Sequence, residues 1–312
     1  MKVNYITMAV ALVGLAACND HDVFEREQYK NVFAFICNSE NINQKMVHLD
    51  NDETTNYVAF SVGGSQPITR QAKINVVEDP TLIDTYNRNT FDLSVGKYAK
   101  PLPKANYTIA SLQCILNPGD VHGVIPITIR PAGLSPDTTY FIPLRVDSYD
   151  AYELNPQKDH ILYRIMTKNR WAKSDASSVY TMRSKRKEVG GTTEIAMPGT
   201  KIMMPLSKTT VRIMAGNEAY AASMGTFNRA AMILEIAEDG RVTIRPFRDL
   251  DVKQIDGDAE FPNKFFYESD GYNTYKTFLL YYTYRIDKTT YEVKEELRLQ
   301  YNKDAEKEED GK

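Results

Sequence analysis

The chain has 312 residues, of which 42% are hydrophobic and 25% charged, a composition typical of a folded soluble protein. Its net charge of −3 argues against a nucleic-acid partner, which would leave a basic footprint. The length exceeds the usual size of one hydrophobic core and therefore predicts two domains.

The first seventeen residues have the pattern of a signal peptide. Lys2 precedes an almost uncharged run over residues 8–15 that is too short to span a bilayer as a mature helix. Residues 15–18, Leu-Ala-Ala-Cys, then resemble the bacterial lipobox, in which small residues precede a cysteine that becomes the lipidated N-terminus. The alternative is an ordinary signal cut after Ala17, which would leave Cys18 as an exposed thiol.

Acylation of Cys18 would anchor the chain to a membrane, because each buried methylene contributes about 0.8 kcal/mol. The next residues, Asn19-Asp20-His21-Asp22, resemble the export signal of surface lipoproteins of the Bacteroidetes. Together the two resemblances imply an outer-membrane protein that is lipid-anchored, faces the cell exterior and has a tether over residues 18–30.

Residues 31–168 consist of short alternating runs separated by turn residues, with no long helical periodicity. One helical turn is expected over residues 79–87, where Pro80 follows an Asp cap. Seven strands of this kind predict an immunoglobulin-like β-sandwich. The expected strands are residues 32–37, 57–62, 72–77, 107–112, 124–130, 140–146 and 161–166.

Three motifs in this half carry a family resemblance. They are the Asp-Pro, Leu-Ile and Tyr-Asn pairs within residues 79–87, the Leu-Pro…Tyr segment at 102–107, and the Leu-Ser-Pro-Asp-Thr-Thr-Tyr-Phe-Ile-Pro-Leu segment at 134–144. Over about residues 30–168 they are similar to the N-terminal domain of surface lipoproteins from Sus-type polysaccharide-utilisation systems. The resemblance implies binding of a polysaccharide or oligosaccharide, with outer-membrane transporter components as further partners.

Residues 169–303 contain eight longer expected strands joined largely by hairpin turns, which predicts a lipocalin-like up-and-down β-barrel. The stretches 270–282 and 295–299 also resemble the C-terminal domain of the same lipoproteins. The charged residues 304–312 have little to bury and are expected to be a disordered tail. The expected strands are residues 179–187, 200–206, 210–214, 230–237, 241–247, 264–267, 275–286 and 291–301.

A tyrosine-rich hairpin in this second half is the candidate glycan site. Sugar rings have apolar C–H faces and hydroxyl edges, so their sites combine flat aromatic rings with carboxylates and amides. The segment supplies both types in Tyr267, Asp270, Tyr272, Asn273 and Tyr275. The alternative is that these aromatic rings cap the barrel and the turn merely connects two strands.

Glu295 is a second residue of interest, because alternation along the last strand places it on the apolar side with Val293 and Leu297. Glu295 could act as a general acid or bind a ligand inside the barrel. Alternatively, its carboxylate could be paired with interior tyrosines or an arginine. Glu296 would face the opposite side, so the two are not expected to form a glycosidase pair.

The remaining chemistry-bearing residues predict neither a metal site nor a cofactor. Cys37 and Cys114 could form a disulfide in an oxidising envelope or remain buried free thiols. The four histidines are scattered, and the chain has no CxxC or HExxH motif and no phosphate-binding glycine loop. A basic run over residues 182–188 could contact an acidic polysaccharide or be a charged outer strand face.

The sequence therefore predicts a surface lipoprotein that binds glycan and is not an enzyme, since it has no G-x-S-x-G motif and few histidines. Two alternatives are a structural or adhesive surface module and a glycoside hydrolase. The hydrolase would need two acidic groups in one cavity, whereas a binding protein needs only aromatic rings and fixed polar groups.

Overall fold

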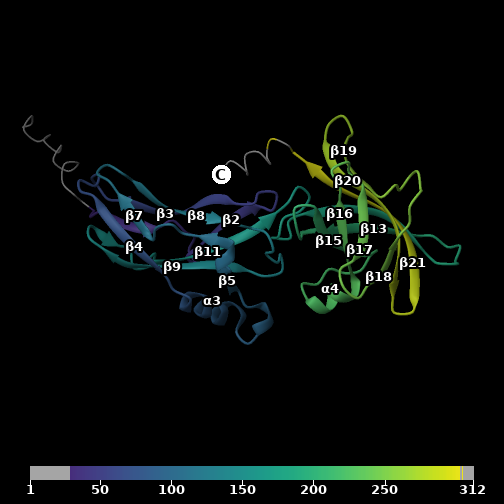
Figure 1. The fold of residues 1–312 in the computed structure, drawn as a ribbon, viewed down its shortest axis with the longest axis horizontal. Coiled ribbons are helices and arrows are strands. Elements are labelled where there is room, and N and C mark those ends of the chain that lie inside the picture. Colours follow the sequence, from purple (N-terminus) through teal and green to yellow (C-terminus); the bar gives the residue numbers. More distant parts are fainter. Residues whose placement is uncertain (1–28, 303, 305–312) are drawn as a thin grey trace, which may run out of the picture.

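The computed structural model of the protein describes residues 29–302 and residue 304 (Figure 1). The predicted signal peptide, the lipidation residue Cys18 and most of the charged tail lie outside the described residues. Within the described part, no helix is long and apolar enough to cross a membrane.

Two sheets make up an N-terminal lobe, residues 29–168, and face each other across one apolar core. Phe33 and Phe60 enter this core from one sheet and Ile74 and Ile142 from the other, and all four are fully buried. The first sheet has the order β10-β1-β3-β8-β6, and the second has β2-β11-β9-β4-β7 with β5 beside β9. The strands are β1 Val32–Phe35, β2 Ile42–His48, β3 Thr54–Gly63, β4 Ala72–Glu78, β5 Lys100–Pro101, β6 Tyr107–Thr108, β7 Gln113–Leu116, β8 His122–Ile129, β9 Tyr140–Tyr149, β10 Glu153–Leu154 and β11 His160–Lys168.

Helix α3, Thr81–Phe91, packs on this lobe against β9 (Figure 1). Asp79 accepts hydrogen bonds from the backbone N–H and the hydroxyl of Thr81, at 3.1 and 2.6 Å, and so satisfies part of the helix start. The ring of Tyr86 packs edge-on against Phe141, 4.9 Å away. The predicted single turn is thus an eleven-residue helix. Two short 3₁₀ turns follow, η1 Val95–Lys97 and η2 Lys104–Asn106.

A second pair of sheets forms a C-terminal lobe, residues 169–302. One has the order β13-β12-β21-β20-β18 with β19 beside β20, and the other has β14-β15-β16-β17. The strands are β12 Val179–Glu188, β13 Ile195–Ile202, β14 Met204–Pro205, β15 Thr210–Met214, β16 Ala231–Ile236, β17 Val242–Pro246, β18 Asp251–Gln254, β19 Lys264–Ser269, β20 Thr274–Ile286 and β21 Thr289–Tyr301, with helix α4, Met224–Ala230, between β15 and β16.

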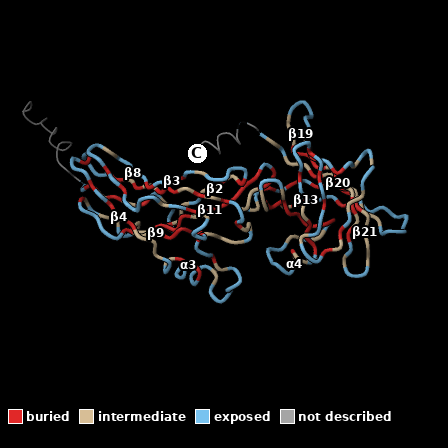
Figure 2. The backbone as a smooth tube through the Cα atoms, in the orientation of Figure 1, coloured by how far each residue is buried: buried red, intermediate tan, exposed pale blue. Residues whose placement is uncertain are grey.

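The all-β prediction is confirmed, while the finer assignments stay predictions. In the C-terminal lobe most neighbouring strands follow chain order, except that both β18 and β19 pair with β20, and the first strand, β12, pairs with the last, β21, as in an up-and-down barrel. The hydrogen-bonded ladder is nevertheless divided into two sheets, so the described strands do not form one continuous closed sheet. Buried side chains from both sheets form one core, and Figure 2 shows the buried segments along the strands of each lobe.

The two lobes meet at a junction fixed by buried polar contacts. Arg212 of β15 is almost fully buried and forms two hydrogen bonds of 2.6 Å with the carboxylate of Asp137, in the turn before β9. The guanidinium also lies 3.7 Å from the ring centre of Phe227. The side chain of Asn169 donates to the carbonyls of Ser207 and Thr210. These contacts connect the end of the N-terminal lobe to strand β15.

The two described cysteines are free thiols, which excludes the disulfide alternative in this structure. Cys37 lies just after β1 and Cys114 lies in β7, so they belong to different sheets of the N-terminal lobe. Burial raises the pKa of the Cys114 thiol to about 11, so it behaves as a small apolar core residue.

Candidate binding groove at the lobe junction

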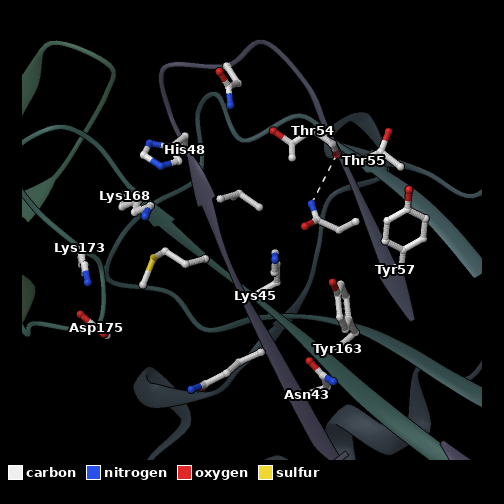
Figure 3. A pocket seen from close by; sticks show the side chains of 15 residues that line it. Asn43, Lys45, His48, Thr54, Thr55, Tyr57, Tyr163, Lys168, Lys173 and Asp175 are labelled. Carbon is white, nitrogen blue, oxygen red and sulfur yellow. Dashed lines mark hydrogen bonds between the residues drawn. The ribbon is translucent and has the colours of Figure 1, made fainter. Parts of the chain in front are cut away.

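A groove of about 760 Å³ lies where the open side of the N-terminal sandwich meets the first residues of the C-terminal lobe (Figure 3). Strand β2 forms its floor, and the start of β3 forms one side. The other side comes from the end of β11 and the segment after it. The lining residues are Asn43, Gln44, Lys45, Met46, Val47, His48, Asn51, Thr54, Thr55, Asn56, Tyr57, Tyr163, Lys168, Lys173 and Asp175.

Strand β2 can form this floor because it is an edge strand. It pairs in parallel with β11, from Ile42 opposite Leu162 to His48 opposite Lys168, and no other strand pairs with its second side within the described sheets. Its residues are mostly half-buried, since one face covers the core and the other meets the groove. A polar strand at an exposed edge thus places alternate side chains along one surface.

The chemistry of the groove is that of amides and hydroxyls beside one exposed aromatic ring. Asn43, Gln44 and Asn51 supply amides, and Thr54 and Thr55 supply hydroxyls. The Oγ1 atom of Thr54 is buried and has no hydrogen-bond partner among the described residues. Such groups donate and accept hydrogen bonds equally well, which suits a ligand rich in hydroxyls.

Tyr57 is the aromatic member of this surface, with 54% of its side chain exposed. It stands with Thr54 and Thr55 on one side of the groove, whereas His48, Lys168 and Lys173 lie on the other (Figure 3). Tyr163 lies below Tyr57 in this view, near Asn43, and is nearly fully buried, and this burial raises the pKa of its phenol. One exposed ring beside fixed polar groups is the arrangement that a flat sugar face requires.

A second cavity, of about 270 Å³, continues from the groove because the two share His48, Lys168 and Lys173. It lies between the junction segment and the end of β21. Its further lining residues are Asn169, Arg170, Trp171, Ala172, Ser177, Ser178, Lys276, Leu299, Gln300 and Asn302. We call the groove and this cavity together the junction cleft.

The predicted tyrosine hairpin borders the junction cleft through Tyr267. The hydroxyl of Tyr267 accepts a hydrogen bond from Arg170 Nε at 3.0 Å, and the Arg170 guanidinium lies 5.0 Å from the ring centre. The same ring packs against Tyr301 with 4.8 Å between centroids. Tyr267 is 37% exposed, so it contributes both to packing and to the surface.

The other predicted hairpin residues lie at the turn, where Asp270 accepts hydrogen bonds and Tyr272 is exposed. Asp270 accepts hydrogen bonds from the backbone N–H groups of Asn273 and Tyr272, at 2.7 and 3.0 Å, and from the hydroxyl of Tyr275 at 3.0 Å. These bonds, led by the one from Asn273, hold the pKa of Asp270 below its ordinary value. Tyr272 is 97% exposed. Gln300 donates to the side chain of Asn273 at 2.8 Å and thereby joins the turn to the cleft lining.

Glu295 lies in the interior of the C-terminal lobe, fully buried, and not in the junction cleft. It forms an ion pair with Lys201 of β13 and accepts a hydrogen bond of 2.7 Å from Tyr282. Burial lowers the pKa of Lys201, and the nearby Glu295 carboxylate partly offsets this lowering. Burial also raises the pKa of Tyr282 well above its ordinary value. Lys201 also donates to the carbonyl of Met214, so the group is held within the core.

The adjacent carboxylates Glu295 and Glu296 of β21 do not face a common cavity. Glu295 is buried, whereas its neighbour Glu296 is half-buried and lies near Arg298 on the other face of β21. Among the described residues, no three His, Cys, Asp or Glu side chains gather as a metal ion would need.

Two family models match successive parts of the chain. One, described as an N-terminal domain, matches residues 27–153, and the other, described as a C-terminal region, matches residues 159–298. The chain thus carries both parts of this two-domain organisation. The second model begins before β11, a strand that pairs within the N-terminal lobe. No curated protein matches the sequence.

Solved structures from Bacteroides share the fold over most of the chain. A protein of unknown function from Bacteroides ovatus is 14% identical, with a TM-score of 0.67 over 86% of this chain and 94% of its own. Another from the same organism is 14% identical, with a TM-score of 0.62 over 90% and 93%. An auxiliary nutrient-binding protein from Bacteroides thetaiotaomicron is 12% identical, with a TM-score of 0.58 over 85% and 92%.

Proposed function

We propose that the protein is a lipid-anchored binding protein of the cell surface that captures glycan in the junction cleft. The observation that carries this proposal is the lining of the groove, where amides and hydroxyls surround an exposed tyrosine, Tyr57. The fold is shared with a protein named as an auxiliary nutrient-binding protein, which supports a role in capture. The tyrosine hairpin would extend the binding surface beyond Tyr267.

The test is calorimetric titration of residues 19–312 against soluble host, plant and microbial polysaccharides, with product analysis on the same samples. Saturable heat without shortened products is the expected result. Tyr57→Ala should weaken binding about five- to tenfold, because one sugar-facing ring is removed. Tyr29→Ala is the matched control, since Tyr29 is 74% exposed and lines neither cavity. Shortened products would instead indicate a hydrolase, and absence of heat with every glycan would indicate a structural module.

The anchor is tested separately through Cys18. Wild-type chains expressed with the leader should incorporate labelled fatty acid and sediment with membranes, whereas Cys18→Ser should do neither. Equal membrane association of both proteins would contradict the anchor and leave the binding proposal unaffected.

A further inference from the structure

We propose that the outer face of the first N-terminal sheet is a flat platform for neutral, extended β-1,4-linked polysaccharides that also enter the junction cleft, a proposal that rests on the proposed function. Its starting point is the sequence of three strands. The side chains that β1, β3 and β8 turn away from the core include no lysine, arginine, aspartate or glutamate within these described strands. The platform is defined by Ala34, Ile36, Tyr57, Ala59, Val124 and Pro126.

Apolar side chains form continuous rows across this platform. The backbone N–H of Ile36 donates to the carbonyl of Ala59 at 2.8 Å, and Ala59 lies opposite Val124 in the ladder between β3 and β8. Tyr57 lies opposite Pro126 in the same ladder. An antiparallel sheet with one exposed face ordinarily turns polar residues outward. An outward face that is apolar across three strands is therefore a candidate binding surface.

Charged residues return at both ends of the platform. Lys30 and Glu153 form an exposed ion pair of 2.7 Å beside the start of β1. Arg130 lies 3.8 Å from Glu53 beyond the opposite end of β3. On the second sheet of this lobe, by contrast, helix α3 packs against β9 (Figure 1). The uncharged region is thus bounded, as the centre of a binding surface is by its polar rim.

The platform is continuous with the junction cleft. Thr55 and Tyr57 point outward from β3, and both also line the groove, where they stand together on one side (Figure 3). A ligand chain that contacts Tyr57 from the groove therefore meets Pro126 and then Val124 as it continues over the sheet. The occupant of the platform is accordingly the same polymer that the cleft captures.

The shape and polarity of the platform define the class of polymer. Apart from Tyr57 its side chains are short, whereas protein interfaces depend on large anchors that fill pockets. The pairs Tyr57–Pro126 and Ala59–Val124 are two residues apart along the strands, about 7 Å, so apolar contact extends beyond one sugar ring. A β-1,4-linked chain is an extended ribbon with flat C–H faces, while an α-1,4-linked chain coils. A charged polymer would lose water on this surface without gaining a partner.

The polymer class is tested by calorimetric titration of residues 19–312 with four soluble probes. Hydroxyethylcellulose and glucomannan are neutral β-1,4-linked chains, soluble starch is α-1,4-linked, and carboxymethylcellulose shares the backbone of the first probe but is charged. At least one neutral β-1,4-linked probe should bind, and starch and carymethyl-substituted chains should bind at least about tenfold more weakly. Equal or tighter binding of starch or of carboxymethylcellulose would overturn the proposal.

Paired substitutions locate the surface. Ala59→Lys with Val124→Glu places opposite charges across β3 and β8, which keeps the strands compatible, and should weaken binding of the neutral probe about tenfold. The matched control is Ile115→Glu on the second sheet, because Ile115 is 45% exposed, Val124 is 49% exposed, and Ile115 already lies opposite a lysine, Lys73. Equal loss in the paired variant and the control, or no loss in the paired variant, would overturn the proposal.

A milder pair at one position guards against misfolding of the paired variant. Val124→Ser should weaken binding of the neutral probe about threefold, because it removes apolar contact, while Val124→Ile should retain it. Both substitutions keep an exposed side chain in β8, so thermal denaturation should give melting temperatures close to that of the wild type. Equal binding by the serine and isoleucine variants would contradict an apolar contact at this position.

The outcomes separate this proposal from the proposed function. If other glycans bind with saturable heat and Tyr57→Ala weakens them, while no neutral β-1,4-linked probe binds, capture stands and the platform is wrong. Failure of every glycan to bind would overturn both. Light scattering identifies the rival occupant, a second copy of the chain. A dimer that Ala59→Lys with Val124→Glu dissociates would assign the face to self-association and overturn the platform.

Discussion

The two lobes are built from the same kind of element, yet the most deeply buried polar groups of the N-terminal lobe are neutral, whereas the C-terminal lobe, which also buries amides such as Asn263, encloses an ion pair. In the N-terminal lobe, Asn41, Asn56 and Asn87 are buried neutral amides, and Asn87 both donates to and accepts from the backbone of Ala99. In the C-terminal lobe, Lys201 and Glu295 form a fully buried ion pair. A neutral amide needs only local backbone partners, whereas a buried charge depends on a partner from another strand.

The largest expected effect follows from separating that ion pair. Lys201→Met should destabilise the C-terminal lobe by about 3–5 kcal/mol, because it leaves the Glu295 carboxylate buried without its cation. The double variant with Glu295→Leu should recover a large part of this loss. Urea unfolding measures both, and Ile74→Val in the other core, expected to cost about 0.5–1.5 kcal/mol, is the control. Equal destabilisation by the single and double variants would show that packing, not charge, dominates.

The second-largest loss of stability is expected from a mutation at the junction between the lobes. Asp137→Ala removes both acceptors of the buried Arg212 guanidinium and should cost about 2–3 kcal/mol of unfolding free energy. It should also separate the unfolding of the two lobes, which hydrogen exchange of β9 and β15 peptides can follow. Glu153→Ala, which breaks the exposed pair with Lys30, should change stability by less than about 1 kcal/mol. A comparable loss in both variants would contradict a specific role for the junction pair.

Acid should affect the N-terminal lobe through Asp79. The hydrogen bond from the Thr81 hydroxyl, with further help from Arg145, lowers the pKa of Asp79 below its ordinary value of 3.8. A lowered folded-state pKa means that the stabilisation is present above 3.8 and is lost as the pH falls through the folded value. Asp79→Asn should lose about 1 kcal/mol at neutral pH and flatten the acid limb of the urea-unfolding profile. An unchanged acid limb would exclude this carboxyl as its cause.

The smallest effect is expected at the hairpin tip. Tyr272→Ala should alter the unfolding free energy by no more than about 0.5 kcal/mol, because the side chain is 97% exposed. Tyr267→Ala should cost about 1–2 kcal/mol, since it removes the packing on Tyr301 and the contact with Arg170. Thermal denaturation compares the two, and reversal of their order would show that the tip packs more tightly than Tyr267.

Sequence pattern predicted the strands with strong alternation and missed those without it. β3, β20 and β21 alternate over much of their length between more and less buried residues and were expected near their observed positions, as was β9, which begins with a continuous apolar run. The segment Ile42–His48 was not expected as a strand, because as a polar edge strand it buries few of its side chains. The expected strand over residues 107–112 is instead the short β6 followed by β7. Short elements such as α4 and β18 contain too few residues for a period to appear.

The candidate site was likewise predictable only where residues close together in the sequence form a pattern. Period-two alternation placed Glu295 on an apolar face, but its partner Lys201 comes from β13, where Pro198 and Gly199 obscure the pattern. The tyrosine hairpin was visible as a local cluster of residues. The junction cleft was not, because it joins residues 43–57 to residues 163–175 and its shape depends on the pairing of β2 with β11. Basic residues scattered over that range carry no sequence motif.

The parallel pairing of β2 with β11 also sets an order of events during biosynthesis. β2 is made early, but its only neighbour in the described sheets begins at His160, after nearly all of the lobe has been synthesised. The floor of the cleft therefore waits for one of the most distant strand pairings in the lobe, a type of contact that forms slowly. The nascent chain must fold most of its first lobe before any ligand surface exists, so the cleft is completed only as the second lobe begins to emerge.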